Sequence, residues 1–173
     1  FRVMENKLSI LDETEKQRLK LETVLNDKSD DEFKCFMFMR HWTPFAKDII
    51  NNIKAFSPDE IVLLPLYPQY SVTTTGSGLI EWNKQAKLAK LEIPFRVVKA
   101  YPDHDFFVDT IADMIKEKLK SLKSKDYRLL LSAHSLPKKT IEVGDSYQIQ
   151  VEKTCTTLIK KLGDDQLDHI ICY

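Results

Sequence analysis

Short apolar segments alternate with longer amphipathic segments along almost the whole chain of 173 residues. The apolar segments predict strands at residues 33–39, 61–64, 95–99, 127–132 and 169–173. The periodic segments between them predict helices at residues 12–26, 43–56, 78–91, 104–122 and 145–162. Because the strands are apolar on both faces, this alternation predicts an α/β fold in which parallel sheets are flanked by helices on both faces.

Charge and composition argue against several classes of function. The 26 basic and 26 acidic residues balance, so the chain has no electrostatic footprint for nucleic acid or an anionic membrane surface. The apolar runs are far shorter than the roughly 20 residues that span a bilayer. Three widely spaced cysteines, Cys35, Cys155 and Cys172, match no disulfide framework and indicate a reducing compartment. We therefore expect a globular cytoplasmic protein with no nucleic-acid partner.

Both ends of the sequence have the character of internal segments. The chain opens on Phe1, and residues 170–173 have the composition of a buried strand, so we expect a fragment that is truncated at both ends. The lysine-rich stretch 118–125 is the best candidate for a domain boundary. We expect residues 1–123 to form most of one domain and residues 124–173 to begin a second.

Residues of unusual chemistry follow four of the predicted strands. These segments contain arginine, aromatic, hydroxyl and imidazole side chains, and they are Met39 to Trp42, Tyr67 to Ser71, Tyr101 to His104 and Ser132 to Ser135. Because the carboxyl ends of parallel strands share one edge of a sheet, we expect the four loops to converge on a single rim. Such a rim favours a site for a planar, partly anionic ligand.

His134 is the leading candidate on this rim. It comes directly after an apolar strand, and imidazole titrates near neutral pH and is the commonest metal ligand in proteins. A single histidine is more often structural than functional, but the convergence of four loops favours a site residue. Ser132 and Ser135 flank His134, and either hydroxyl could orient its ring.

The loop from Tyr67 to Gly78 is rich in hydroxyl groups. Its hydroxyls and backbone amides precede a predicted helix, an arrangement that suits a carboxylate or a phosphate. The loop lacks the lysine and the glycine spacing of a P-loop, which disfavours a nucleoside triphosphate. A Ser/Thr-rich capping turn without a ligand is the structural alternative.

Three motifs resemble a known family. Residues 64–71, Leu-Pro-Leu-Tyr-Pro-Gln-Tyr-Ser, with residues 74–77 resemble the long loop of the ferrochelatases. Residues 132–137, with Gly144 to Tyr147 and Gln150, resemble the ferrochelatase signature. Residues 39–45 are similar to the family's Met-Arg-Tyr-Trp-x-Pro-Phe. The resemblance covers essentially the whole chain.

The resemblance implies a Rossmann-like chelatase fold of two similar domains and a lyase that inserts Fe²⁺ into protoporphyrin IX in haem biosynthesis. Ferrous iron and protoporphyrin IX would then be substrates, and no tightly bound cofactor is expected. The family's catalytic glutamate lies in a region that this chain lacks, and Glu142 does not match its motif. A peripheral membrane contact through the missing regions is left open.

The resemblance also implies roles for individual residues. His134 would be the catalytic residue, acting as iron ligand, proton acceptor, or both in turn. For porphyrin binding, the propionates would meet Arg40, Ser71, Thr74 and Ser77. The ring faces would meet Trp42, Tyr67 and Tyr70, unless these aromatics pack in a core. We also place Ser132 and Ser135 among the porphyrin-binding residues.

The chain departs from the family at three positions. His41 replaces a tyrosine, and Ser146 replaces a proline, where serine can cap the following helix instead. Val72 stands where animal enzymes carry a cysteine ligand, so no iron–sulfur cluster is expected. Two alternatives stay open: a chelatase that inserts Co²⁺ or Ni²⁺ into another tetrapyrrole, and a non-catalytic tetrapyrrole-binding module. The first is disfavoured because smaller chelatases lack the Tyr-Pro-Gln-Tyr loop.

Overall fold

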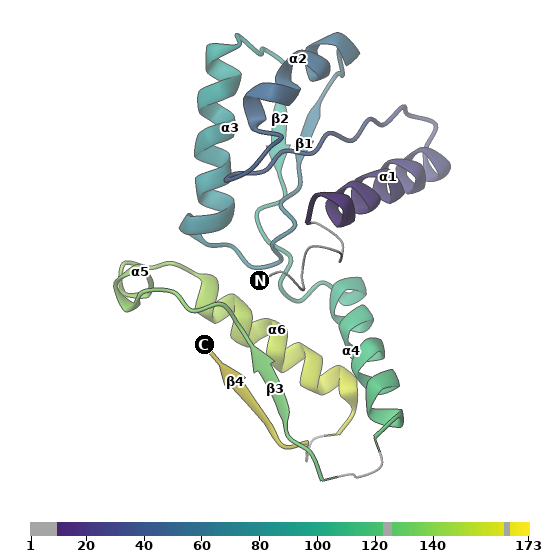
Figure 1. Cartoon of the computed structure of the whole chain (residues 1–173), viewed down its shortest axis with the longest axis vertical. Coiled ribbons are helices and arrows are strands. Elements are labelled where there is room, and N and C mark those ends of the chain that lie inside the picture. The colour runs from purple at the N-terminus through teal and green to yellow at the C-terminus, as the bar shows by residue number, and fades with distance from the viewer. Residues whose placement is uncertain (1–9, 123–125, 165–166) are drawn as a thin grey trace, which may run out of the picture. The chain divides into compact units, whose positions relative to one another are not determined.

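The computed structural model describes residues 10–122, 126–164 and 167–173 (Figure 1). The chain divides into two compact units, of which the first comprises Phe1–Ile61 and Gly78–Phe95 and the second Val62–Ser77 and Arg96–Tyr173. The predicted domain boundary between residues 123 and 124 lies outside the described residues and stays a prediction. Within the described ranges, no helix is long and apolar enough to cross a membrane.

Helices and short strands alternate from β1 onward (Figure 1). The helices are α1 (Ile10–Lys28), α2 (Ala46–Phe56), α3 (Ser77–Leu88), α4 (Asp105–Lys120), α5 (Lys138–Glu142) and α6 (Tyr147–Leu162), with a π-helical turn η1 (Val72–Gly76) directly before α3. The strands are β1 (Ile61–Leu63), β2 (Phe95–Val97), β3 (Leu129–Ser132) and β4 (His169–Cys172). The short helix α5 and the turn η1 are elements that the sequence pattern did not predict.

The four strands form two parallel pairs, which confirms the predicted α/β class. β1 pairs with β2, and the Ile61 N–H donates to Pro94 O at 2.9 Å while the Val98 N–H donates to Leu63 O at 3.0 Å. β3 runs parallel to β4, with Leu129 opposite His169 and Ser132 opposite Cys172. The strands of each pair are separated by a helix in sequence, as parallel connections require.

The predicted strand at residues 33–39 is wrong, because this segment is irregular. Side chains of α1 form hydrogen bonds with backbone groups that a neighbouring strand would otherwise pair. Asn26 Nδ2 donates to Phe33 O and Asn26 Oδ1 accepts the Phe33 N–H, both at 2.9 Å. Glu22 Oε2 accepts the Cys35 N–H at 2.7 Å, and Arg18 Nη1 donates to Cys35 O at 2.9 Å. The apolar run is therefore held by a helix and not by a sheet.

The helix predicted from Thr43 begins later, at Ala46. The Thr43–Pro44 peptide bond is cis, and the cap position belongs to Phe45. The Phe45 N–H donates to Asp48 Oδ2 at 2.8 Å, and the Asp48 N–H donates to Phe45 O at 2.9 Å. The Asp48 carboxylate thus serves the first turn from inside the helix.

The core of the first unit lies around Trp82, which is fully buried. Its ring stacks on Phe38 at a centroid distance of 6.0 Å and meets Phe95 edge-on at 6.1 Å. Helix α2 contributes a buried stripe at helical spacing, formed by Ala46, Ile49, Ile50 and Ile53. The apolar residues of the irregular segment are therefore sheltered by aromatic contacts.

The core of the second unit lies between α4 and α6, which pack side by side (Figure 1). Val108 and Ala112 of α4 pack with Leu158 of α6, and Leu131 of β3 contacts this cluster. The outward residues of the β3–β4 sheet, Leu130 and Ile170, are 62% and 46% exposed. The helices therefore cover one face of this sheet and position the residues that follow its carboxyl edge.

Candidate active site at the carboxyl edge of the β3–β4 sheet

His134 lies two residues beyond the carboxyl end of β3. The Ala133 N–H donates to Cys172 O at 2.8 Å, so the strand pairing continues one residue past β3. The His134 N–H then donates to Tyr147 Oη at 3.1 Å, while the imidazole is exposed and has no hydrogen-bond partner among the residues that the structure describes. Hydrogen bonds from the Ala133 and His134 N–H groups hold the backbone here, and the His134 ring is available to a ligand.

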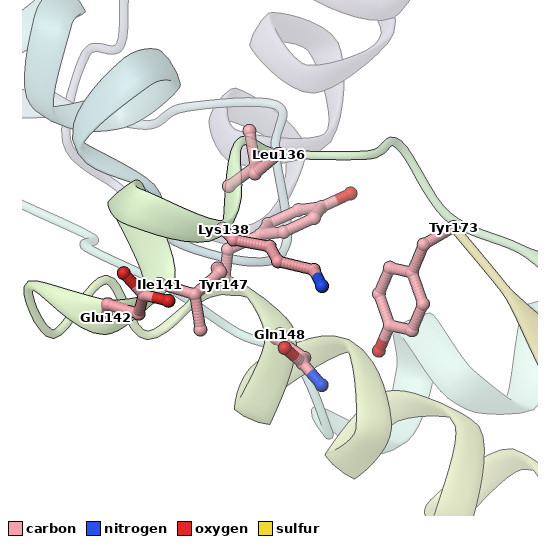
Figure 2. Close-up of a pocket in the computed structure, with 7 residues that line it drawn as sticks. All are labelled: Leu136, Lys138, Ile141, Glu142, Tyr147, Gln148 and Tyr173. Atoms are coloured by element: carbon pink, nitrogen blue, oxygen red, sulfur yellow. The ribbon is translucent and has the colours of Figure 1, made fainter.

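A pocket of about 350 Å³ lies beside this position and includes Tyr147 in its wall. Figure 2 shows the Lys138 side chain pointing into the pocket toward Tyr173, which directly follows β4, while Glu142 lies on the opposite side. Burial, with a smaller contribution from the nearby Glu152 carboxylate, raises the pKa of the Tyr173 phenol. At the carboxyl edge of the sheet, the Lys138 side chain thus shares a pocket with the phenol side chains of Tyr147 and Tyr173.

The hydroxyl-rich loop after β1 is tied to the start of α6 by a buried carboxylate. Asp145 is 6% exposed, and its Oδ2 accepts hydrogen bonds from Ser71 Oγ at 3.0 Å and from the Val72 N–H at 2.7 Å. Its Oδ1 accepts the Tyr147 N–H at 2.9 Å. Three donors and the positive end of α6 compensate the cost of burying this charge. The loop is therefore held at a defined place in the second unit.

Two further side chains of α6 hold the same loop. Gln150 Oε1 accepts the Tyr70 N–H at 2.7 Å, and Thr154 Oγ1 accepts from Gln69 Nε2 at 2.8 Å. On the other side, the Tyr101 N–H donates to Pro68 O at 2.8 Å. The loop is thus fixed from α6 and from the segment after β2 together.

Gly76 allows a close approach within this loop. A Cβ atom at this position would lie 2.9 Å from Tyr70 Oη, which is shorter than ordinary contacts. Glycine therefore lets the Tyr70 phenol lie against the turn η1. The turn is π-helical. This form is rare in proteins as a whole, but where it occurs it is often at a functional site.

The second unit contains seven of the predicted porphyrin-binding residues as well as His134. Tyr67 is 57% exposed, and Ser132 and Ser135 are also exposed beside His134. Three others are half-buried, namely Tyr70, Thr74 and Ser77. Ser71 is 1% exposed, and its hydroxyl is bonded to Asp145. Ser71 therefore presents no surface to a propionate in this structure, and its predicted contact stays a prediction.

Arg40 and Trp42 belong to the first unit, where Arg40 is exposed and Trp42 is 62% exposed. The prediction of one rim shared by four strand ends is wrong in its first member, because residues 33–39 form no strand. It is also wrong in its geometry, because the described strands form two sheets and not one. The hydrogen bonds through Asp145 nevertheless connect the loop after β1 with the start of α6, and Tyr147 connects α6 with His134.

The roles of Asp145, Tyr147 and Gln150 were missed by the sequence reasoning. The signal was present, because all three belong to the matched motif after His134. Ser146 was expected to cap α6, but its side chain makes no capping bond and instead accepts from Gln150 Nε2 at 3.0 Å. Asp145 instead accepts the N–H of Tyr147, the first residue of α6, and also accepts from Ser71.

No group of three or more His, Cys, Asp or Glu side chains that could hold a metal ion occurs in the described part of the chain. A metal ion at His134 would therefore need further ligands from a substrate, from water or from residues outside the described ranges. Three protein ligands are the usual minimum for a resident catalytic metal.

Comparison with known proteins identifies the family. The sequence model of the Ferrochelatase family matches residues 2–173. A ferrochelatase from Pelagibacter ubique is 41% identical over 165 residues, which cover 95% of this chain and 47% of that protein. One from Rickettsia prowazekii is 39% identical over 173 residues, which cover 100% of this chain and 49% of that protein. One from a Wolbachia of Drosophila simulans is 41% identical over 168 residues, which cover 96% and 53%.

The chain spans about half the length of these curated relatives. Its matched region, residues 2–173, includes the histidine loop, the hydroxyl-rich loop and the motif at the start of α6. On this match, the chain belongs to the ferrochelatase family.

Proposed function

We propose that the protein acts in haem biosynthesis as a lyase that inserts Fe²⁺ into protoporphyrin IX. The observation that carries this proposal is the match of residues 2–173 to the ferrochelatase family, with named relatives about 40% identical. We further propose a cytoplasmic location, iron as a substrate without a resident cofactor, and no nucleic-acid partner. The balanced charge of the chain supports the last point.

The proposed reaction requires a base that is free and held in place. Insertion of Fe²⁺ releases two pyrrole protons from the macrocycle and removes water from the iron. His134 is suited to both tasks, since its exposed imidazole is available while its backbone is bonded to Tyr147 Oη. One nitrogen lone pair cannot bind iron and accept a proton at once, so His134 would perform these tasks in turn. The second proton requires another acceptor.

The proposed porphyrin contacts divide by chemistry. The Arg40 guanidinium can bind a propionate in a bidentate geometry, and the hydroxyls of Thr74 and Ser77 can donate to the other propionate. The exposed ring of Tyr67, with Tyr70 and Trp42, offers flat apolar surface to the macrocycle. Ser132 and Ser135 lie on either side of His134 and can orient its ring. We propose that Ser71 supports the loop of residues 67–77 from inside the protein, because its side chain is buried.

The test is the substitution His134→Ala in the full-length protein. We expect insertion of Fe²⁺ or Zn²⁺ into protoporphyrin IX to fall by about 100-fold or more, because a base and ligand is removed. Binding of protoporphyrin IX, measured by quenching of its fluorescence, should remain close to that of the unchanged protein. This separates loss of chemistry from loss of binding.

His169→Ala is the matched control, because His169 is an exposed histidine at the opposite end of the same sheet. It should leave insertion unchanged. Retained insertion in His134→Ala would refute the assignment of His134. Insertion of Co²⁺ or Ni²⁺ into a different tetrapyrrole, with none into protoporphyrin IX, would refute the proposed substrate.

A further inference from the structure

One carboxylate joins the two loops that carry the candidate residues. Asp145 Oδ2 binds Ser71 Oγ and the Val72 N–H, and Oδ1 binds the Tyr147 N–H. Tyr147 Oη in turn accepts the His134 N–H at 3.1 Å. An unbroken series of bonds therefore runs from the loop after β1, through Asp145 and Tyr147, to the backbone of His134.

We propose that Asp145 is a positioning residue that sets where the loop of residues 67–77 lies relative to His134. The inference rests on the proposed function and names the residue that organises its site. Asp145 is 6% exposed and spends both carboxylate oxygens on protein donors, so it acts through Ser71 and Tyr147 and not on the substrate. Its place two residues before α6 also puts it near the favourable end of the helix dipole.

A carboxylate is needed here because every partner is a donor. Both oxygens of Asp145 accept hydrogen bonds, and an amide has only one oxygen and one NH₂ group. In Asp145→Asn, the NH₂ group would face either the Tyr147 N–H or the Val72 N–H, leaving a part-buried donor unpaired. The side chain would keep its size, so the substitution changes the positions of the loops without opening a cavity.

The two ends of this series should affect different constants. Ser71→Ala removes the bond to Asp145 together with the two bonds between Ser71 Oγ and Thr73, and we expect the Kd for protoporphyrin IX to rise about threefold with kcat nearly unchanged. Tyr147→Phe removes the acceptor of the His134 N–H, and we expect kcat to fall about tenfold with Kd nearly unchanged. Asp145→Asn should do both, because Asp145 holds both ends.

The experiment measures Kd by fluorescence quenching and kcat by metal insertion in the full-length protein. Ser71→Ala should raise Kd less in the Asp145→Asn background than in the unchanged protein, since one of the bonds that it removes, the bond to Asp145, is already altered there. Asp109→Asn is the matched control, because it makes the same chemical change at a different contact. Asp109 Oδ1 of α4 lies 2.6 Å from Lys161 Nζ of α6. A merely structural loss would lower the melting temperature, and Ser71→Ala and Tyr147→Phe would then change Kd and kcat in the same way. Positioning by Asp145 predicts instead that Ser71→Ala changes mainly Kd and Tyr147→Phe mainly kcat.

Asp145→Asn with unchanged Kd and kcat would overturn the inference, and so would full additivity with Ser71→Ala. A full-length protein that binds protoporphyrin IX but inserts no metal would refute the proposed function instead. In that case the Kd values of Asp145→Asn and Ser71→Ala alone decide whether Asp145 positions the loop. Failure of the inference and failure of the function are thereby distinguished.

Discussion

Two segments with opposite compositions both depart from the structures that their compositions predict. Residues 33–39 are mostly apolar and were expected to form a buried strand, yet they are irregular. Residues 67–77 are polar and were expected to form a loop, yet their last six residues adopt helical structure in η1 and the start of α3. Both segments are nevertheless well anchored, the first on α1 and the second on α6.

The difference lies in where the backbone hydrogen bonds go. Side chains of α1 satisfy Phe33 and Cys35, whereas Gln150 of α6 satisfies Tyr70 and Asp145, two residues before α6, satisfies Val72. A buried backbone group must be paired, but the partner need not be another backbone. Side-chain partners replace a sheet in the first segment and hold a functional loop in the second.

Of the substitutions that test this comparison, Trp82→Ala should have the largest effect on stability. Trp82 is fully buried and stacks on Phe38 of the irregular segment, so its removal leaves a cavity and releases this segment from its shelter. We expect the free energy of unfolding to fall by about 3–5 kcal/mol. Urea denaturation followed by circular dichroism measures this change.

Trp42→Ala is the matched control for stability, because Trp42 is 62% exposed. Its free energy of unfolding should stay within about 0.5 kcal/mol of the unchanged protein. Equal losses in the two variants would show that the aromatic cluster does not support residues 33–39.

The parts of the fold that depend on local pattern could be predicted from the sequence. The amphipathic periodicity of α4 and α6 and the apolar runs of β3 and β4 lead to elements within a few residues of those observed. The failure at residues 33–39 has a physical cause, because apolar composition reports burial but not the source of the hydrogen-bond partners. Those partners lie on α1, where Asn26 is seven residues from Phe33 and Glu22 is 13 residues from Cys35.

The candidate site shows the same division. His134 was identified because a strand pattern ends directly before it, and the structure places it at the carboxyl edge of β3. Asp145 could be located in a motif but its task could not, since its partner Ser71 is 74 residues away in sequence. Ser71 was read as a ligand contact because hydroxyls in a loop suggest one, and burial is a tertiary property that the pattern does not contain.

The next largest effect is expected from Glu22→Ala. Glu22 Oε2 accepts the Cys35 N–H at 2.7 Å and pairs with Arg18 at 3.0 Å, and its side chain is 18% exposed. We expect the free energy of unfolding at neutral pH to fall by about 2 kcal/mol, the usual range for a hydrogen bond to a charged group. Urea denaturation measures the loss, and amide hydrogen exchange at Cys35 locates it.

The same substitution predicts a dependence on pH. The Cys35 N–H, with help from Lys34 and Arg18, lowers the pKa of Glu22 below its ordinary value of 4.5. A lowered carboxyl pKa stabilises the fold above the unfolded value, and this contribution disappears as the pH falls through the folded value. The stability difference from Glu22→Ala should therefore be constant above about pH 5 and shrink below it. Glu13→Ala, at an exposed pair with Lys16, should cost about 0.5 kcal/mol or less; a larger loss there would contradict the distinction.

The smallest effect is expected in the second segment, residues 67–77. Gln150→Ala removes the acceptor of the Tyr70 N–H at 2.7 Å but leaves the bonds of Asp145 intact. We expect a loss of about 1 kcal/mol in the free energy of unfolding, with faster amide exchange at Tyr70 and little change at Val72. Gln148→Ala is the control on the same helix, since its amide bonds only to Glu152 four residues on. Faster exchange at Val72 as well as Tyr70 in Gln150→Ala would show that the two anchors act as one unit, and the loop would then depend on α6 as a whole and not chiefly on Asp145.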